Sequence, residues 1–501
     1  MRLAHDQIVE NGSRFSDKIA ISTSSEQIAY GDVVAQASEL ADRLVRCGIG
    51  RGATVAIPAI REPGVVIAML ATLLAGGAYV PIEPRDADRQ VARLQKQLNI
   101  GATVRVTRGP AWDSSDKYSV EGHPPSVRAP SYRVSAQTWL DLAYVFLTSG
   151  STGMPKAVAV EHRNLVHSTS ARDAYERPNC DVTFLCTQAL SFDASVYEIF
   201  WTLSRAGELV IATEDEILDP LALGELMYRR GVHYLNCSPS YYGVLLDTVP
   251  PKNLASIRHV TVGGEECRPA LASAHFSTVP DAVLVNDYGP SECAVWSTRH
   301  KVERLESPIP IGTAIPGAAV YILKDLQTGT METSGELYIS GDGVGRGYVG
   351  DVRLTAERFL PDPFSSTPGR RMYRTGDIVD TSPRGEIVFV GRRDDEVKVR
   401  GFRIQLNLVA RYLRNVTGVT DAVVLLLGRG EDAHLVAFVV TGNHVVSQQD
   451  ICSELEGELP HYSIPQRVIA VNQIPRTERG KPDRSLLHQI ANDNRSCSNE
   501  R

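Results

Sequence analysis

Residues 142–156 read Leu-Ala-Tyr-Val-Phe-Leu-Thr-Ser-Gly-Ser-Thr-Gly-Met-Pro-Lys, and this stretch carries the strongest functional signal in the chain. Its first five residues are apolar or aromatic and predict a buried strand. Thr148 to Lys156 then supply four hydroxyl groups, two glycines and one lysine. Such groups suit the oxygens of a polyphosphate. The order is not the Walker pattern, because no Gly-Lys-Ser/Thr opens a helix. A Ser/Gly surface linker is the alternative, but the strand before it and the Pro-Lys after it weigh against that interpretation.

Strand and helix patterns alternate on both sides of this stretch. Apolar residues at helical spacing or in short runs predict these elements. Alternation of this kind is typical of α/β layers around a largely parallel sheet. The predicted helices are Tyr30–Val45, Val65–Leu74 and Tyr197–Leu203, and the predicted strands are Thr54–Ile57, Ala78–Ile82, Phe184–Cys186, Glu208–Ile211 and Val283–Val285.

The pattern changes from about Ser307. Short β-rich runs at Ala319–Leu323, Gly335–Ser340 and Glu386–Val390 are separated by glycines and predict a barrel-like or antiparallel subdomain. We therefore expect an α/β fold in which residues 1–393 form one large domain of layered α/β subdomains plus a β-barrel-like subdomain.

A small α+β domain is predicted to follow, over residues 394–491. Its elements are a charged strand pair at Glu396–Arg403, a helix near Leu406–Val416, strands at Ala422–Leu427 and His434–Val440, and a helix near Gln448–Leu459. The polar residues 492–501 are expected to be a disordered tail.

Composition excludes several classes of protein. The 501 residues include 52 basic and 59 acidic side chains, a net charge of −7 that argues against a general nucleic-acid binder. The eight cysteines show neither Cys-x-x-Cys nor zinc-ligand spacing, so we expect reduced thiols in a cytoplasmic protein. The apolar stretch Val65–Ile82 contains Gly76, Gly77 and Pro81, and it predicts a buried helix turning into a strand rather than a membrane span. The N-terminus lacks the apolar run of a signal peptide.

The segment 142–158 resembles the phosphate-loop signature of adenylate-forming enzymes, specifically the adenylation domains of nonribosomal peptide synthetases. Eight further blocks resemble that family and occur in its order. They are residues 73–84, 191–195 (Ser-Phe-Asp-Ala-Ser), 286–292 (Asn-Asp-Tyr-Gly-Pro-Ser-Glu), 335–341, 373–377 (Tyr-Arg-Thr-Gly-Asp), 391–404, 459–465 and 480–484 (Gly-Lys-Pro-Asp-Arg).

The resemblance implies that a substrate carboxylate attacks the α-phosphate of ATP, releasing pyrophosphate and leaving an acyl-AMP. Because both reactants are anionic, such a site neutralises charge and holds geometry. Thr148, Lys156 and Lys481 are the implied catalytic residues, and Glu292 is the implied Mg²⁺ ligand, a hard oxygen donor. Tyr288 would stack on adenine, Asp377 and Arg392 would hold the ribose, and Asp394 matches the hinge of a mobile lid domain. The implied ATP-binding residues are Thr148, Ser149, Gly150, Ser151, Thr152, Gly153, Lys156, Asn286, Asp287, Tyr288, Gly289, Ser291, Asp377, Arg392 and Lys481.

Asp193 matches the family position that binds the α-ammonium of amino-acid substrates, and relatives that use fatty or aryl acids generally lack it. Its alternative is an N-cap for the following helix. The remaining implied pocket residues are Ala194, Tyr197, Asn236, Thr261, Gly263, Asp287, Val295, Trp296 and Lys481. Tyr197 and Trp296 should shorten the cavity, and Asn236 and Asp287 would be costly to bury unless the ligand satisfies them. We therefore expect a small to medium amino acid with a polar or cationic side chain.

Three features depart from the family. Ala157 replaces the usual glycine after Pro-Lys. Residues 405–410 (Gln-Leu-Asn-Leu-Val-Ala) lack the usual acids, which makes thioester formation less secure than adenylation. No carrier domain with its serine follows, so we expect a free-standing enzyme that loads a separate carrier protein in trans, with a small MbtH-like helper as a further candidate partner.

Two other functions remain open at this point. One is an adenylate-forming ligase that passes its acyl group to coenzyme A or to an amine. The other is a catalytically weak binding or scaffold protein, which the retention of Lys156, Glu292, Asp377, Arg392 and Lys481 disfavours. Absence of exchange of pyrophosphate into ATP with every amino acid of a panel would favour the scaffold protein or an unusual acid substrate. Exchange without transfer to any carrier would favour the ligase that uses another acceptor.

Overall fold

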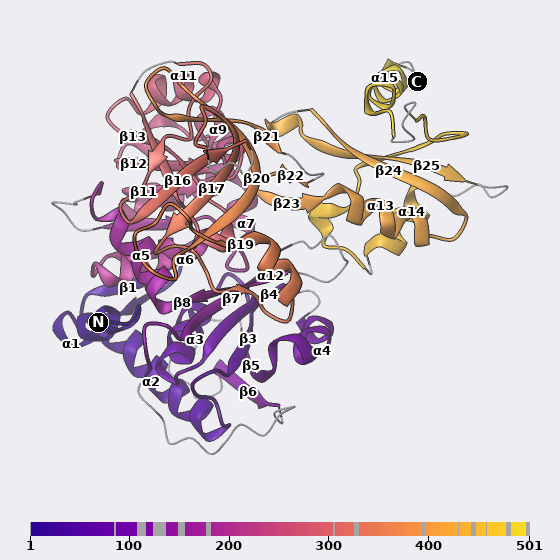
Figure 1. The fold of residues 1–501 in the computed structure, drawn as a ribbon. Helices are drawn as coiled ribbons and strands as arrows, with labels where there is room; N and C mark the ends of the chain where they lie inside the picture. The colour runs from indigo at the N-terminus through magenta and orange to yellow at the C-terminus, as the bar shows by residue number, and fades with distance from the viewer. Residues whose placement is uncertain are drawn as a thin grey trace.

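The computed structural model describes residues 2–84, 87–107, 117–123, 137–148, 156–176, 182–303, 306–324, 330–392, 396–428, 430–441, 447–456, 458–476 and 482–496. A large body holds the N-terminal and central parts of the chain, and a smaller lobe holds the C-terminal part (Figure 1). This confirms the predicted α/β class with a large domain followed by a small α+β domain.

One layer of the large body is a sheet of seven described strands. Their order is β18 (Gly347–Tyr348), β8 (Lys156–Glu161), β7 (Leu142–Thr148), β4 (Ala78–Ile82), β3 (Thr54–Pro58), β5 (Ile100–Val106) and β6 (Tyr118–Gly122). The central strands β7, β4, β3 and β5 run parallel to one another, and β8 and β6 run antiparallel to them. Strand β18 pairs antiparallel with β8. Helices α1 (Asp6–Arg14), α2 (Tyr30–Arg46), α3 (Pro63–Leu74), α4 (Ala87–Leu98) and α5 (His162–Arg172) belong to this part of the chain.

Helix α3 is apolar on all sides and is buried from Pro63 through Leu73. A helix of that kind belongs in a protein core. Gly76 turns the chain at a φ of +89°, a conformation that favours glycine, and β4 follows at once. The expected buried helix turning into a strand is therefore confirmed. In the described residues, no helix combines the length and hydropathy that a membrane span needs.

The second layer is a sheet of nine described strands. Their order is β15 (Thr313–Ala314), β14 (Thr298–Val302), β13 (Val283–Tyr288), β12 (His259–Gly263), β11 (Tyr234–Cys237), β9 (Thr183–Cys186), β10 (Glu208–Ile211), β1 (Ile19–Ser22) and β2 (Gln27–Ala29). The six strands from β13 to β1 are parallel, as the alternating pattern predicts. The helices of this part are α6 (Ala194–Ser204), α7 (Glu214–Leu218), α8 (Pro220–Arg230), α9 (Pro239–Thr248), α10 (Pro251–Leu254) and α11 (Pro269–Thr278).

A third, antiparallel sheet confirms the predicted change of pattern after Ser307. Its described strands are β16 (Ala318–Leu323), β17 (Ser334–Gly341), β20 (Arg371–Thr381), β19 (Phe359–Pro361) and β21 (Ile387–Arg392), with helix α12 (Val352–Arg358) between β18 and β19.

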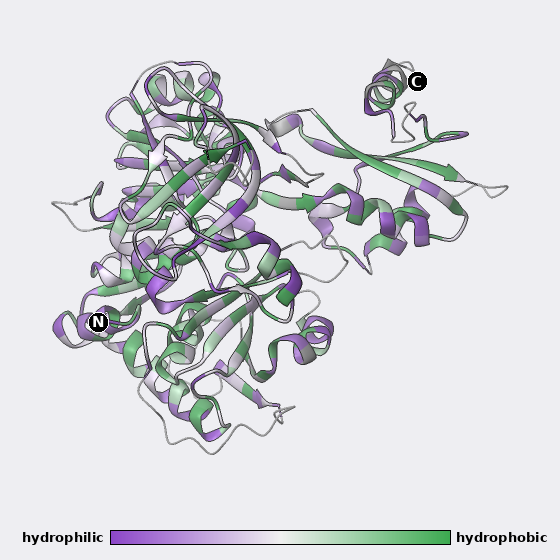
Figure 2. Ribbon diagram, viewed as in Figure 1, coloured by the Kyte–Doolittle hydropathy of each residue, from purple (hydrophilic) through white to green (hydrophobic). Residues whose placement is uncertain are grey.

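The C-terminal lobe begins with a hairpin of β22 (Glu396–Val399) and β23 (Phe402–Gln405). A three-stranded sheet of β24 (Val419–Leu427), β25 (His434–Thr441) and β26 (Arg467–Ala470) follows, with α13 (Leu406–Asn415), α14 (Gln448–Glu456) and α15 (Arg484–Ser496). The strands β24 and β25 are mostly hydrophobic, whereas polar residues mark the outer parts of α13 and α14 (Figure 2). Residues 492–496 continue α15, so they are helical rather than part of the expected disordered tail.

Candidate active site

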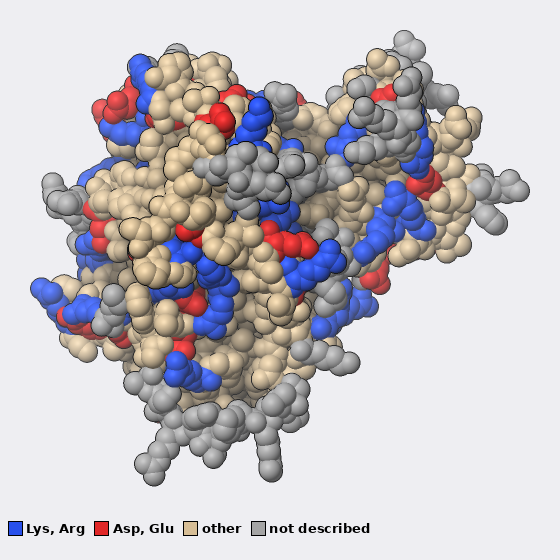
Figure 3. All heavy atoms as spheres, in the orientation of Figure 1, with Lys and Arg blue, Asp and Glu red and all other residues tan. Residues whose placement is uncertain are grey.

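A cavity of about 1630 Å³ lies between the large body and the C-terminal lobe. Its walls come from the end of β7, the start of α6, the carboxyl ends of β11, β12 and β13, and the hairpin β22–β23. The carboxyl ends of parallel strands meet at one edge of a sheet, which is where α/β proteins place their ligands. On the face shown in Figure 3, basic and acidic side chains are interspersed around the body and the lobe.

The expected phosphate loop connects the antiparallel strands β7 and β8. Thr148 pairs with Lys156, and these two residues flank the loop. Ser149, Gly150, Ser151, Thr152 and Gly153 lie outside the described residues. Thr148 lines the cavity, and its Oγ1 has no hydrogen-bond partner in the described part of the chain. A hydroxyl left open in this way suits an oxygen-rich ligand. Lys156 is buried and is not among the residues that line the cavity.

Tyr288, Asp377 and Arg392 meet on the other side of the cavity. Strand register places Asp377 opposite Arg392, whose Nη1 donates to Oδ1 at 2.6 Å, and the Tyr288 hydroxyl donates to Oδ2. Burial and the neighbouring Asp377 carboxylate raise the pKa of Tyr288 well above its ordinary value, so the phenol keeps its proton. The three residues that the sequence assigns to adenine and ribose therefore form one hydrogen-bonded group.

Asn286, predicted to bind ATP, and Glu292, predicted to bind Mg²⁺, are not among the residues that line the cavity. Asn286 Nδ2 donates to the carbonyl of Pro310 at 2.7 Å, a contact that holds the chain rather than a ligand. Glu292 lies in the short helix η3 (Ser291–Cys293), is fully buried and accepts a hydrogen bond from the Tyr348 hydroxyl at 2.7 Å. Mg²⁺ is often held by one or two carboxylates together with substrate phosphates. Glu292 is a carboxylate of this kind, and its role as an Mg²⁺ ligand stays a prediction.

Asp193 stands at the first position before helix α6, lines the cavity and is buried. Its side chain makes no capping hydrogen bond, so the N-cap interpretation finds no support. Burial raises the pKa of this carboxyl to about 6, against a hydrogen bond from Ser291 and the charge of Lys398, which lower it. A buried carboxylate held at this cost is typical of a site that receives a cation.

The predicted pocket residues Ala194, Tyr197, Asn236, Thr261 and Gly263 all line the same cavity. So do Asp287, Tyr288, Gly289, Ser291, Val295 and Trp296. Val295 adopts a φ of +83°, which a β-branched residue rarely does, and it follows Ala294 at +56°. Strain of this kind persists only where surrounding structure enforces it. Here the chain returns so closely on itself that a Cβ on Gly289 would lie 2.4 Å from Trp296 Cα.

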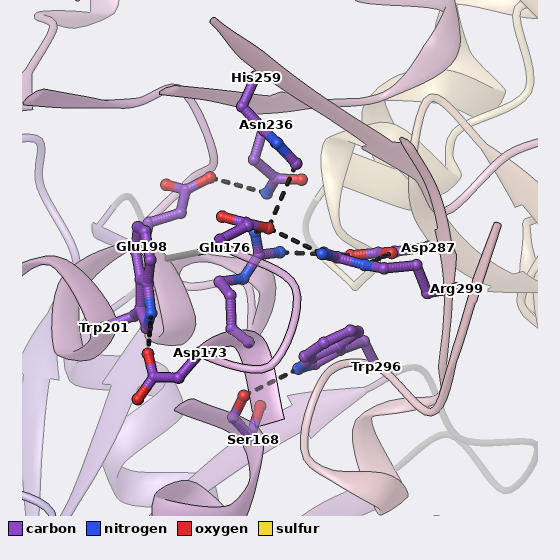
Figure 4. A network of polar contacts seen from close by, with 11 residues as sticks. Ser168, Asp173, Glu176, Glu198, Trp201, Asn236, His259, Asp287, Trp296 and Arg299 are labelled. Carbon is purple, nitrogen blue, oxygen red and sulfur yellow. Dashed lines mark hydrogen bonds and ion pairs between the residues drawn. The ribbon is translucent and has the colours of Figure 1, made fainter. Parts of the chain in front are cut away.

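Asp287 and Asn236 are already satisfied by the protein, so the premise that they need a ligand is wrong. Arg299 lies opposite Asp287 on β14, and its Nε and Nη2 donate to the two carboxylate oxygens at 2.7 Å each. Asn236 Nδ2 donates to Glu198 Oε1 at 2.8 Å (Figure 4). Asp287 therefore no longer supports the prediction of a cationic substrate side chain.

Family comparison agrees with the geometry. The AMP-binding enzyme family matches residues 8–349, and the AMP-binding enzyme C-terminal domain matches residues 411–481. The chain belongs to the AMP-binding enzyme family.

The chain is similar to several synthases and synthetases. The chain is 33% identical over 492 residues to bacitracin synthase 3 of Bacillus licheniformis, covering 96% of this chain and 8% of that protein. It is 33% identical over 516 residues to malpinin synthetase of Mortierella alpina, covering 98% of this chain and 6% of that protein. Holo-PA1221, an NRPS protein that contains adenylation and PCP domains bound to a vinylsulfonamide inhibitor, superposes with a TM-score of 0.82 at 26% identity, covering 97% of this chain and 84% of that one.

This AMP-binding enzyme is thus an adenylate-forming adenylation domain of the nonribosomal peptide synthetase type. The chain spans less than a tenth of the length of the two synthetases named above.

The C-terminal lobe of this AMP-binding enzyme contributes residues to which the sequence assigned no role. Phe402 stacks on Tyr462, with ring centroids 4.2 Å apart, and also approaches Phe192 of the large body at 6.1 Å. The Lys398 ammonium lies 5.8 Å from the centre of the Tyr288 ring. These residues fall within the blocks 391–404 and 459–465, so the family resemblance marked their segments but not their function. Asp394 and Lys481 lie outside the described residues.

Proposed function

We propose that this AMP-binding enzyme activates an α-amino acid as its aminoacyl adenylate. The single observation that carries the proposal is Asp193, a buried carboxylate that lines the cavity and makes no capping hydrogen bond to helix α6. An α-ammonium placed beside it forms a charged pair, which offsets the cost of burying the carboxylate. A fatty or aryl acid brings no cation and leaves that charge uncompensated.

The first step joins one oxygen of the substrate carboxylate to the α-phosphorus of ATP. The bond from that phosphorus to the bridging oxygen breaks, pyrophosphate leaves, and the aminoacyl-AMP stays bound. Thr148 and Lys156, with the loop between them, hold the β- and γ-phosphates. The pair Asp377 and Arg392 holds the ribose, and the Tyr288 ring supports the adenine. Mg²⁺ on Glu292 and the phosphates would offset negative charge.

The Lys481 ammonium is proposed to bind the reacting carboxylate and the ribose. A cation placed where charge develops typically lowers a barrier by about 3–4 kcal/mol. This assignment rests on the resemblance of the block 480–484 to the family.

For the second step we propose transfer to the phosphopantetheine thiol of a carrier protein supplied in trans. The thiolate attacks the carbonyl carbon of the adenylate, AMP leaves, and a thioester forms. PA1221 contains an adenylation and a PCP domain, which supports a carrier as acceptor. Because ATP is consumed and free thiols are used, we propose a cytoplasmic location.

ATP–pyrophosphate exchange tests the first step. Wild-type protein, purified with and without an MbtH-like helper, is assayed with a panel of amino acids and with their α-hydroxy analogues. Exchange should depend on the amino acid, and Asp193→Asn should reduce it at least about a hundredfold. Asp32→Asn, an exposed change far from the cavity, is the matched control. Exchange driven better by hydroxy, fatty or aryl acids than by any amino acid contradicts the proposal.

Loading assays test the second step. Transfer of a radiolabelled amino acid to a purified holo carrier supports it. Transfer to coenzyme A or to an amine, with no carrier loading, identifies the other acceptor classes.

A further inference from the structure

Behind the cavity wall lies a buried cluster of charges that the family pocket positions do not include. It comprises Arg172 at the end of α5, Glu176 just after it, and Arg299 on β14. Both arginines contact Asp287, and Glu176 contacts both arginines. Figure 4 shows Glu176, Asp287 and Arg299. Of these four residues, only Asp287 lines the cavity. The cluster therefore acts on the cavity through that one carboxylate.

Two guanidinium groups bridge the two carboxylates. Arg299 holds both oxygens of Asp287 and also donates from Nη1 to Glu176 Oε1 at 2.8 Å. Arg172 donates from Nη1 to the same Glu176 oxygen at 2.6 Å and from Nη2 to Asp287 Oδ2 at 3.2 Å. Bidentate arrangements of this kind are the strong form of charge-assisted hydrogen bond.

The cluster is electrically neutral. Burial lowers the pKa of the adjacent His259 to about 4, so this imidazole adds no charge at neutral pH. Burial alone would raise the pKa of Glu176, but Arg172, His259 and Arg299 outweigh it and lower the pKa to about 2. Two cations thus face two anions. Glu198, behind Asn236, adds little charge near neutrality, because burial raises its pKa to about 8.

The same guanidinium groups fix the aromatic walls of the cavity. The Arg172 guanidinium carbon lies 4.1 Å from the centre of the Tyr197 ring, and that of Arg299 lies 4.5 Å from a Trp296 ring centre. Trp296 Nε1 also donates to the carbonyl of Ser168 at 3.0 Å. The aromatic walls are therefore held from outside the cavity by guanidinium groups. A cationic substrate side chain in the cavity would lie close to these guanidinium groups and would be repelled by them.

Besides Thr148, two further residues that line the cavity have a hydroxyl without a hydrogen-bond partner in the described part of the chain. Tyr197 Oη and Thr261 Oγ1 are buried, and within the described ranges neither has a hydrogen-bond partner. A buried polar atom without a partner is costly, and a ligand that hydrogen-bonds to it removes the cost.

We propose that Arg172, Glu176 and Arg299 are specificity-determining residues that neutralise Asp287 and restrict the pocket to an uncharged amino-acid side chain with a hydroxyl or carboxamide group. The inference rests on the proposed amino-acid activation. A cationic side chain competes with two guanidinium groups for Asp287. An anionic side chain gains little from the two guanidinium groups, because the N–H groups that face Asp287 already donate to its carboxylate.

Matched substrates test separately, in ATP–pyrophosphate exchange, whether the side chain must be uncharged and whether it must form hydrogen bonds. Threonine and valine have the same shape but differ in the hydroxyl. Asparagine and aspartate differ in charge, and 2,4-diaminobutyrate supplies a short cation. The best uncharged hydrogen-bonding amino acid should exceed its apolar isostere by at least about tenfold in kcat/KM. Aspartate and 2,4-diaminobutyrate should remain at background.

A charge-release variant tests the cluster itself. Arg299→Met removes the bidentate partner of Asp287, so the preference for 2,4-diaminobutyrate over threonine should rise at least about tenfold. The double variant Asp287→Asn, Arg299→Met is neutral again and should lose that gain. Arg205→Met is the matched control, since Arg205 pairs with Asp173 at the protein surface. Thermal melting monitors folding, and the wild-type panel tests the proposal even if a variant fails to fold.

The outcomes are distinct. Strongest exchange with a charged or an aliphatic amino acid overturns the pocket inference and leaves amino-acid activation standing. An unchanged preference in folded Arg299→Met overturns the role of the cluster. Exchange with no amino acid at all overturns the proposed function, and this inference with it.

Discussion

Asp377 and Arg392 face each other across the antiparallel strands β20 and β21, and Arg392 Nη1 lies 2.6 Å from Asp377 Oδ1. The carboxylate is buried and takes its second hydrogen bond from Tyr288. The carboxylate that we propose to bind the ribose is thus held in place by two donors from different strands.

Replacing Arg392 by Met should weaken ATP binding. The change leaves the Asp377 carboxylate with one donor in place of two, which allows it to rotate away from the ribose. We expect the KM for ATP to rise at least about tenfold, with a smaller change in kcat. Arg353→Met is the control, because Arg353 pairs with Glu357 on an exposed helix face. An unchanged KM for ATP in a folded Arg392→Met protein would show that the pair does not position the nucleotide.

Tyr288→Phe and Tyr288→Ala separate the hydroxyl from the ring. Phenylalanine keeps the flat surface and loses one hydrogen bond to a charged group, worth about 1.5 kcal/mol or roughly tenfold in the KM for ATP. Alanine also removes the ring, so its KM should rise further, by about another tenfold. Steady-state exchange at varied ATP measures both. Equal effects of the two changes would argue against stacking.

Asp193→Asn should stabilise the substrate-free protein at neutral pH while it abolishes activity. Burial raises the pKa of Asp193 from 3.8 to about 6, so the folded state favours the protonated carboxyl. Its ionised form therefore destabilises the fold above about pH 6, by up to about 3 kcal/mol, and this cost disappears as the pH falls towards 3.8.

Thermal melts of wild type and Asp193→Asn test this relation. The variant should melt higher at pH 7.5, and the difference should shrink near pH 4. For wild-type enzyme, the KM for the amino acid should rise as the pH falls below about 6. A variant that melts lower than wild type at pH 7.5 would assign Asp193 a structural role.

Glu176→Gln should destabilise the fold. The change takes one anion from a buried cluster with two guanidinium groups, and breaking a buried pair of this kind typically costs about 3–5 kcal/mol. Because the folded pKa is lowered from 4.5 to about 2, the carboxylate stabilises the fold above pH 4.5, and this contribution is lost as the pH falls towards 2.

Urea unfolding at pH 7 and pH 3 measures that contribution. The difference between wild type and Glu176→Gln should be large at pH 7 and smaller at pH 3. Glu225→Gln, which alters an exposed pair with Arg229, is the control and should change little at either pH. A pH-independent difference would mean that charge at Glu176 is not what stabilises the cluster.

The layered fold could be predicted because its signals are local. Buried strands such as Thr54–Pro58 and Ala78–Ile82 are short apolar runs, and α3 is an uninterrupted apolar helix. Helix α15 was missed because its sequence is mostly polar. Leu487 and Ala491, four residues apart, are its fully buried contacts with the β24–β25 side of the lobe. With Leu486 and Ile490 the helix has only four apolar residues among thirteen, which is a weak periodic signal.

Many residues that line the cavity could be predicted from the sequence, but their pairings could not. Asp287 and Asn236 were expected to await a ligand, because sequence shows a polar residue without showing its partner. Arg299 reaches Asp287 only through the antiparallel register of β13 and β14, which depends on how the chain returns after Gly289. Phe402 and Tyr462 stack although sixty residues separate them, and no local pattern predicts such a contact.

ATP–pyrophosphate exchange with the purified wild-type chain, combined with mass-spectrometric detection of the adenylate, tests the central claim most directly. We predict exchange that requires an α-amino acid, an aminoacyl-AMP as the bound product, and loss of both in Asp193→Asn but not in Asp32→Asn. Exchange that is absent with every amino acid, or that is supported by acids lacking an α-ammonium and survives in Asp193→Asn, would contradict it.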